Sequence, residues 1–528
     1  MAFKIPMKYL SDDHKKCILK DCTLIEKIQR KGNYYFKPKQ IEFFDISMGQ
    51  QGEQEISLPM YYASELFNCN QINRTRKFLQ IEPFTMTPGF ELRDYQKISL
   101  ELALNNYSKY STCFFNVYCS YGKTTVAAFS AAGFSQQYKL RTLVTFHRIL
   151  IGNSWLGTFK DNTTAKIYVV GVTKGPITDD VQVILCMDTR IGNIPIDVLS
   201  SIGHLVVDEA DCFCTELKGK ALLNIQPLFI TLLTATYEKN NGFHTMLDLM
   251  AGPIRITRTA PKQFFVIHIP TPFKADPSKG AYGINYNELV EELDDNEWRN
   301  SFLLQTIMDN INEKIMIIFI HVPSAVRFYF WCLEYFEQMG KQIRLLAGDI
   351  PTYEDGDIII ATKSKVGIGF DEKHSCKNWN GRRINMLILA NSMRTIEQTA
   401  GRAFRADVPV IVMFGDDNNN VKSQWNSNKT LFRSQNGVVL EFDILQRFCW
   451  DDIRDDILLK YKEEGELRAR QIYEDEIKKD QANAVPRILV SSRRPKISEL
   501  EESGSLTPTM SASHDEMVAN IMANYKNF

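Results

Sequence analysis

The chain has 528 residues, more than one ordinary hydrophobic core accommodates, and at about 100–200 residues per domain it predicts roughly three or four units. Hydrophobic residues make up 44% and charged residues 24% of the sequence, which is average for a globular chain and excludes a largely disordered protein. The formal net charge of -1 excludes a passive nucleic-acid coat, so any contact with nucleic acid must be local.

The 11 cysteines form no paired C-x-x-C framework, which favours reduced thiols in an intracellular protein. We expect the cysteines and the eight histidines to be core or surface residues and not zinc ligands. The N-terminus lacks the features of a signal peptide, and no apolar stretch approaches the length of a membrane span. The expected location is therefore the cytoplasm, the nucleus or a virion, without a membrane partner.

Residues 1–90 predict a small accessory domain. Two short strand candidates, 41–46 and 55–60, flank the Gly-Gln-Gln-Gly sequence at 49–52, a pattern typical of a hairpin.

Residues 91–260 alternate short β-branched or aromatic runs with longer helical patterns, and residues 261–416 do so again after a proline-rich connector. The strand candidates are 113–119, 141–146, 166–170, 181–186, 204–207 and 229–233 in the first half, and 315–320, 343–346, 357–361, 386–389 and 410–414 in the second. Such alternation predicts an α/β fold with two parallel sheets covered by helices.

The C-terminal part begins with a turn-prone break at 417–420 and continues as an extension over 417–490. Dense charge with apolar residues at helical spacing predicts a long exposed helix over 451–481. We favour a solvated helix that packs by one stripe, and a dedicated partner site is the alternative. The tail, 491–528, is rich in Ser, Thr, Pro and charge at its start, which predicts partial disorder.

A phosphate-binding loop is predicted where an apolar strand candidate runs into Gly122-Lys123-Thr124 and then into a helical pattern. Backbone N–H groups at such a helix start bind phosphates, Lys123 adds a positive charge for the β and γ phosphates, and Thr124 offers a hydroxyl to Mg²⁺. Val117 stands where the full pattern has its first glycine, so a chance Gly-Lys-Thr is the alternative. The residues expected to bind ATP here are Cys119, Ser120, Tyr121, Gly122, Lys123, Thr124 and Thr125.

An acidic pair follows the buried strand candidate 204–207. Asp208 can hold Mg²⁺ and Glu209 can orient and deprotonate an attacking water. A strand end followed by an acidic helix cap is the alternative reading.

With these motifs the chain resembles the superfamily 2 helicases, whose two tandem RecA-like domains hold one ATP. The resemblance covers residues 92–415. By this resemblance, the segment Arg93-Asp94-Tyr95-Gln96 is similar to the one that binds adenine in these helicases, with Gln96 as the residue that contacts the base. Residues 142–148 with Trp155 resemble the motif that contacts the nucleic-acid backbone. Thr234-Ala235-Thr236 resembles the motif that couples hydrolysis to domain movement. The residues that the resemblance assigns to nucleic acid are His147, Arg148, Thr189, Arg190 and Thr362.

The second half carries the remaining motifs of this resemblance. Gly369 and Asp371, in the segment 367–371, are expected near the nucleotide. Arg402 and Arg405 share one face of a helix at spacing i, i+3, which suits arginine fingers, and a surface arginine pair is the alternative. Gln398 belongs to the same motif and is expected to take part in catalysis.

Residues 208–211 spell Asp-Glu-Ala-Asp, yet Gln398 and Thr234-Ala235-Thr236 are more similar to duplex-DNA translocases, including the transcript-release helicases of large DNA viruses. The resemblance therefore implies an ATP- and Mg²⁺-dependent helicase or translocase on nucleic acid. DNA is favoured and RNA is the alternative, with a transcription-machinery partner at the N- or C-terminal extension. A catalytically inactive nucleic-acid-binding scaffold is the hypothesis from another class.

Overall fold

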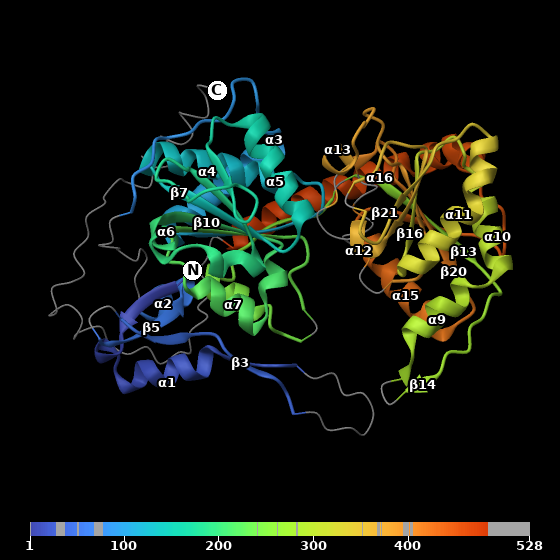
Figure 1. Cartoon of the computed structure of the whole chain (residues 1–528). Coiled ribbons are helices and arrows are strands. Elements are labelled where there is room, and N and C mark those ends of the chain that lie inside the picture. Colours follow the sequence, from blue (N-terminus) through green and yellow to red (C-terminus); the bar gives the residue numbers. More distant parts are fainter. Residues whose placement is uncertain are drawn as a thin grey trace. The chain divides into compact units, whose positions relative to one another are not determined.

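The computed structural model describes residues 2–27, 37–49, 52–67, 78–239, 241–260, 262–280, 283–350, 352–366, 370, 372–393, 396, 401 and 405–483. These residues form two compact units (Figure 1). The first contains the described parts of Met1–Val117, Gly122–Arg258 and Lys479–Phe528, and the second contains those of Tyr118–Tyr121 and Thr259–Lys478. Each unit is built on one large sheet.

The first unit begins with a small antiparallel sheet in which β5 (Gln54–Pro59) lies between β1 (Ala2–Pro6) and β4 (Asp45–Met48). The predicted hairpin is confirmed, because β4 and β5 pair antiparallel. The predicted strand 41–46 is divided, since its first residues belong to another antiparallel pair. The remaining elements are β2 (Thr23–Ile25), β3 (Gln40–Glu42), α1 (Asp12–Asp21) and α2 (Met60–Leu66).

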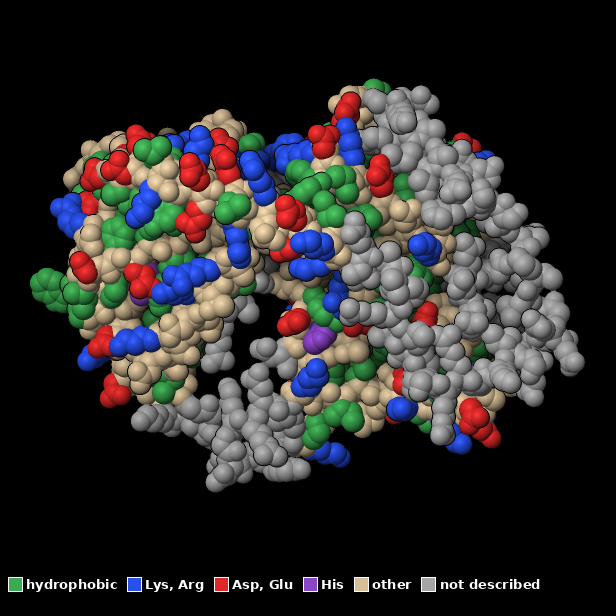
Figure 2. All heavy atoms as spheres, turned by 180° about the vertical axis from the view of Figure 1, so that it is seen from behind, with side chains coloured by type: hydrophobic (Ala, Val, Ile, Leu, Met, Phe, Trp, Pro, Cys, Tyr) green, Lys and Arg blue, Asp and Glu red, His purple; other side chains and the backbone are tan. Residues whose placement is uncertain are grey.

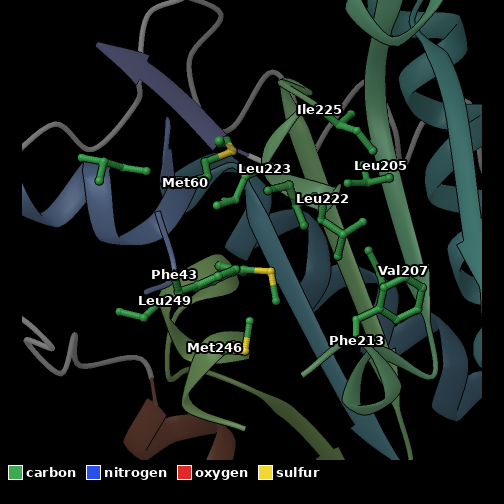
Figure 3. Packing of buried hydrophobic residues seen from close by; sticks show 14 of the residues in the cluster. Phe43, Met60, Leu205, Val207, Phe213, Leu222, Leu223, Ile225, Met246 and Leu249 are labelled. Carbon is green, nitrogen blue, oxygen red and sulfur yellow. The ribbon is translucent and has the colours of Figure 1, made fainter. Parts of the chain in front are cut away.

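The N-terminal segment shares a hydrophobic core with the first large sheet. Phe43 and Met60 belong to the same buried cluster as Leu222 and Met246 (Figure 3). Gly219 permits this approach, because a Cβ atom there would lie 2.2 Å from Met246 Cε. The small N-terminal sheet is thus held by apolar contacts with the helices of the first unit.

The large sheet of the first unit has seven strands in the order β12-β6-β11-β10-β7-β9-β8, and all neighbours are parallel. Its strands are β6 (Thr112–Val117), β7 (Arg141–Phe146), β8 (Ile167–Val169), β9 (Val183–Met187), β10 (Ile202–Asp208), β11 (Phe229–Thr234) and β12 (Ile256–Arg258). Its helices are α3 (Asp94–Tyr110), α4 (Lys123–Tyr138), α5 (Ile149–Asn162), α6 (Ile196–Ser201), α7 (Glu216–Leu223) and α8 (Thr245–Ala251). Since β11 alone separates β6 from β10, their carboxyl ends lie at the same edge of the sheet.

The large sheet of the second unit also has seven parallel strands, in the order β17-β18-β16-β19-β20-β13-β21. The strands are β13 (Phe264–Pro270), β16 (Ile315–Phe319), β17 (Ile343–Leu346), β18 (Ile358–Thr362), β19 (Met386–Leu389), β20 (Val410–Gly415) and β21 (Gly437–Glu441). The helices and the small hairpin are α9 (Tyr286–Asp294), α10 (Glu297–Asp309), α11 (Val322–Gln338), α12 (Lys363–Val366), α13 (Glu372–Ser375), α15 (Asn419–Ser434), β14 (Lys279–Gly280) and β15 (Gly283–Ile284).

The expected α/β class with two parallel sheets is confirmed, as are the small N-terminal sheet and the C-terminal helix. That helix, α16 (Trp450–Asn483), packs its first turns on the second sheet through Trp450, Ile453 and Ile457. Further along it, Asp480 forms an ion pair with Arg258 at 2.9 Å. Within the described residues, no helix is both long and apolar enough to cross a lipid bilayer.

Candidate nucleotide and nucleic-acid sites

The predicted phosphate loop lies between β6 and α4, at the carboxyl edge of the first sheet. Gly122 immediately precedes α4 and has a φ of 91°, and Ser120 has a φ of 72°. Such positive φ values suit glycine and strain a residue with a Cβ atom, so Ser120 holds an uncommon backbone conformation. The first turn of α4 therefore begins at a tight left-handed turn, with Lys123 and Thr124 as its first residues.

Gln96 packs against this loop. Its side chain is buried, its Oε1 accepts a hydrogen bond from Arg93 N at 3.0 Å, and a Cβ atom on Gly122 would lie 2.3 Å from its Nε2. The structure thus brings the residue expected to read adenine next to the phosphate loop. Gly122 is required there twice, by its φ angle and by the close approach of Gln96.

Asp208 and Glu209 lie at the end of β10, and both are buried. Asp208 Oδ1 accepts from Glu209 N at 2.9 Å, and Asp208 Oδ2 accepts from Trp155 Nε1 at 2.8 Å. Burial raises the pKa of Asp208, and the positive charge of Lys123 opposes this increase by favouring the ionised carboxylate. Lys123 of the loop and Asp208 are therefore close enough to act on one another.

Trp155 is not at the surface. Its side chain is fully buried and stacks on Phe159, with ring centroids 5.7 Å apart. The expectation that Trp155 takes part in contacts with the nucleic-acid backbone is therefore wrong, because the residue belongs to the core and directs its only polar atom at Asp208.

Asp211 connects the acidic strand end to the segment Thr234-Ala235-Thr236. Its Oδ1 accepts from Thr234 Oγ1 at 2.9 Å, and its Oδ2 accepts from Thr236 Oγ1 at 3.1 Å and from Lys239 Nζ at 2.6 Å. The sequence predicted a coupling role for the threonine segment but did not single out Lys239. Only the proximity of a lysine to that segment in the chain could have suggested it.

A cluster of polar side chains lies at the adjacent carboxyl ends of β7 and β9. Asp188 is buried and its Oδ2 lies 2.8 Å from His147 Nδ1 and 2.7 Å from Lys218 Nζ, while its Oδ1 accepts from Thr189 N at 2.7 Å. His147 and Lys218 keep 34% and 26% of their side chains exposed, so both side chains face solvent in part. We call Asp188, His147 and Lys218 the β7–β9 cluster.

Four residues that the sequence assigned to nucleic acid, His147, Arg148, Thr189 and Arg190, follow these two strands directly. Arg190 donates from Nη1 to the carbonyl of Val170 at 3.0 Å. Asp188 and Lys218 were missed, because their relation to His147 depends on the pairing of β7 with β9 and on the placement of α7.

In the second unit, Thr362 ends β18 and is fully buried, with its hydroxyl 3.0 Å from that of Ser364. Ser120 belongs to this unit, because Tyr118–Tyr121 are part of it. Its Oγ donates to the carbonyl of Gly401 and accepts from Arg405 Nε, each at 3.2 Å. Four predicted site residues, Gly369, Asp371, Gln398 and Arg402, lie outside the described residues.

Among the described residues, no group of three or more His, Cys, Asp and Glu side chains has the arrangement of a metal site. A carboxylate from Asp208 and a hydroxyl from Thr124 fit Mg²⁺ nonetheless, because this ion prefers oxygen and is commonly held by one or two carboxylates together with the phosphates of its nucleotide. Figure 2 shows basic and acidic side chains interspersed over the visible face, so on that face no broad field of one sign stands out.

No family model matches the chain. The chain is similar to "Putative helicase 161L" of Invertebrate iridescent virus 6, with 22% identity over 382 residues that cover 67% of this chain and 83% of the relative. It is also similar to "Putative ATP-dependent RNA helicase L396" of Acanthamoeba polyphaga mimivirus, with 22% identity over 454 residues, 79% of this chain and 83% of the relative. The expected likeness to helicases of large DNA viruses is confirmed at this level.

Two solved structures resemble the chain more distantly. The crystal structure of T4 UvsW has 14% identity and a TM-score of 0.31, over 79% of this chain and 91% of the other. S. cerevisiae Dbp5 bound to RNA and ADP BeF3 has 12% identity and a TM-score of 0.45, over 72% and 93%.

Proposed function

We propose that the chain is a nucleic-acid-dependent ATPase of helicase superfamily 2, which acts as an ATP-driven helicase or translocase. The observation that carries the proposal is the buried pair Asp208 and Glu209, with Lys123 close enough to influence the ionisation of Asp208. A cation at a helix start and a carboxylate pair at the same sheet edge are what phosphoryl transfer from ATP requires. The similarity to viral proteins named as helicases supports the same class.

In this proposal Lys123 and the backbone N–H groups of the first turn of α4 bind the phosphates. Thr124 and Asp208 would hold Mg²⁺, which when bound neutralises charge on the phosphates. Glu209 accepts a proton from the attacking water. The remaining contacts with ATP are assigned to Gln96, Cys119, Ser120, Tyr121, Gly122, Thr125, Gly369 and Asp371.

Arg402 and Arg405 complete the proposed site as arginine fingers, with Gln398 beside them. An arginine that stabilises the transferring phosphoryl group accelerates related reactions by about 10³–10⁵. If residues of both sheets bind one ATP, its hydrolysis changes their interaction, and this cycle moves the protein along a strand.

The nucleic-acid surface is assigned to His147, Arg148, Thr189 and Arg190. Thr362, which the resemblance also assigns to nucleic acid, is fully buried at the end of β18. The partly exposed side chains of Lys218 and His147 in the β7–β9 cluster support the assignment of the other four residues, since phosphate oxygens accept hydrogen bonds from lysine and from imidazole N–H groups. Contact with the backbone predicts weak sequence preference and strong dependence on salt.

Duplex DNA is the favoured substrate because of Gln398 and the Thr234-Ala235-Thr236 segment. The name of the mimivirus relative, an RNA helicase, supports RNA as the alternative. If the substrate is duplex DNA, we propose a role in transcription, with a partner from the transcription machinery that binds the N- or C-terminal extension.

The test is the ATPase rate of the full-length chain with Mg²⁺ and no nucleic acid, duplex DNA, single-stranded DNA or RNA, over a range of salt concentrations. We expect duplex DNA to stimulate most and the stimulation to fall with salt. Stimulation by RNA alone would contradict the DNA assignment. Binding of nucleic acid without any ATPase activity would instead favour the inactive scaffold.

Three variants test the residue roles within the same assay. Lys123→Ala should lose nucleotide binding, Glu209→Gln should bind ATP without turnover, and Arg405→Ala should bind ATP but hydrolyse it slowly. Near-normal turnover in all three would refute the proposed site.

A further inference from the structure

The side chain of Trp155 meets the carboxylate of Asp208 inside the core of the first unit. The distance from indole Nε1 to Asp208 Oδ2 is 2.8 Å. Trp155 comes from α5, which follows β7, and β7 pairs in parallel with β10, the strand that ends at Asp208. The crossover from β7 thus carries the tryptophan to the end of the neighbouring strand.

This contact has a fixed direction. An indole Nε1–H is a donor only, so Trp155 donates and Asp208 accepts. The second oxygen, Oδ1, accepts from Glu209 N at 2.9 Å. With one donor on each oxygen, the plane of the carboxylate is set by groups that cannot rotate away: a backbone N–H and a ring packed against Phe159. A carboxylate offers about four lone-pair sites, so each oxygen keeps capacity for a further ligand.

Packing alone does not account for a tryptophan here. The ring stacks on Phe159, and a phenylalanine could make the same stacking contact. What only the tryptophan supplies is the N–H aimed at Asp208. Partners of metal-ligating carboxylates orient them in this way, and their removal typically lowers metal affinity by about 10- to 100-fold.

We propose that Trp155 is a positioning residue that orients Asp208 to receive the Mg²⁺ ion that accompanies ATP, an inference that rests on the proposed ATPase function. Trp155 touches neither the nucleotide nor the ion. It acts through Asp208, and it couples the helix that follows β7 to the metal-binding end of β10.

The experiment measures binding and not turnover. A non-hydrolysable ATP analogue is titrated into the full-length chain by calorimetry, in EDTA and over a series of Mg²⁺ concentrations. For Trp155→Phe we expect an unchanged affinity for the analogue in EDTA. The Mg²⁺ concentration at which the affinity has gained half of its Mg²⁺-dependent increase should be about tenfold higher than for the wild type. Trp450→Phe is the matched control, since Trp450 is also a large, fully buried tryptophan, and it should follow the wild-type curve.

The outcomes separate the two proposals. If the wild-type chain binds no analogue at any Mg²⁺ concentration, the ATPase proposal fails and the role of Trp155 with it. If the wild type shows a Mg²⁺ effect and Trp155→Phe shows the same curve, only the role of Trp155 is refuted.

A second measurement covers the case in which Trp155→Phe does not fold. Asp208→Asn keeps the size of the side chain, so the one indole signal that it shifts among the six tryptophans in a ¹H–¹⁵N spectrum belongs to Trp155. Adding Mg²⁺ to the analogue-bound wild-type chain should shift that signal. If Mg²⁺ leaves it unmoved, the proposal is overturned.

Discussion

Lys239 Nζ lies 2.6 Å from Asp211 Oδ2, on the same carboxylate that accepts hydrogen bonds from Thr234 and Thr236. Burial lowers the pKa of Lys239, but the charge and hydrogen bond of Asp211 outweigh burial and raise it above its ordinary value. The lysine therefore neutralises a buried carboxylate that joins the end of β10 to the loop after β11.

Lys239→Met should weaken the coupling between nucleotide and nucleic acid. A charge-assisted hydrogen bond contributes about 1.5–3 kcal/mol, so its loss in the transition state corresponds to a rate that is roughly 10- to 150-fold lower. Because Lys239 contacts neither acidic residue of the proposed reaction site, we expect the nucleic-acid-stimulated ATPase to fall more than the basal rate. Lys239→Arg, which keeps the charge, is the control. Equal loss of basal and stimulated rates in Lys239→Met would show that Lys239 acts on hydrolysis itself.

Gly122→Ala should weaken nucleotide binding for two separable reasons. An alanine at a φ of 91° is strained by about 1–2 kcal/mol, and its Cβ atom would meet Gln96 Nε2 at 2.3 Å. Gln96→Ala removes the second obstacle but not the first. In calorimetric titrations with an ATP analogue, the double variant should therefore lose less than the sum of the two single losses. Strict additivity would show that the contact with Gln96 does not matter.

Lys218→Met tests the β7–β9 cluster. If Lys218 contacts a phosphate, its loss should weaken the binding of nucleic acid equally for all sequences. The magnitude of the slope of log affinity against log salt concentration should decrease by about 1. Lys220→Met is the matched control, because Lys220 lies on the same helix and pairs with Glu216 at 3.5 Å. Fluorescence anisotropy with labelled duplex DNA and RNA measures both slopes. The same slope in Lys218→Met and the wild type would remove Lys218 from the interface.

The sequence predicted the central strands well, because a short continuous apolar run between turn signals is typical of a buried strand. The bounds of β7 and β19 agree with the predicted 141–146 and 386–389, and those of the edge strand β17 agree with the predicted 343–346. The prediction missed β13, whose flanking prolines indicated a connector, although it pairs with β20 and β21. It also missed β12 and β21. β21 lies at the sheet edge and is only partly buried, so its apolar pattern is weak.

The sequence could single out candidate site residues only where a motif is local. Lys123 and Asp208 stand in short segments whose spacing carries the chemistry. Asp188, Lys218 and the true place of Trp155 could not be predicted, since their partners are distant in sequence and meet only after the parallel strands have paired. Sequence spacing gives no information on such contacts.

Two buried histidines predict how stability depends on pH. Burial lowers the pKa of His204 to about 3 and that of His268 to about 4, from an ordinary value of 6.5. His204 lies between the hydroxyls of Thr142 and Thr231, whereas His268 stacks on Trp425. In the unfolded chain both rings bind a proton below about pH 6.5, so unfolding takes up protons and acid favours it.

Each neutral histidine therefore makes its full contribution to the free energy of unfolding above pH 6.5. This contribution is lost as the pH falls toward 4 for His268 and toward 3 for His204. Within this window, each unit by which the pH falls lowers the free energy of unfolding by about 1.4 kcal/mol per histidine. His204→Gln removes one titrating group, so opening of the first sheet should depend less on pH between 7 and 5, while His268→Gln should do the same for the second sheet. Hydrogen exchange of the two sheets, followed separately, measures this because two units need not unfold in one step. An unchanged pH dependence of the first sheet in His204→Gln would mean that His204 is not the group that acid protonates on unfolding.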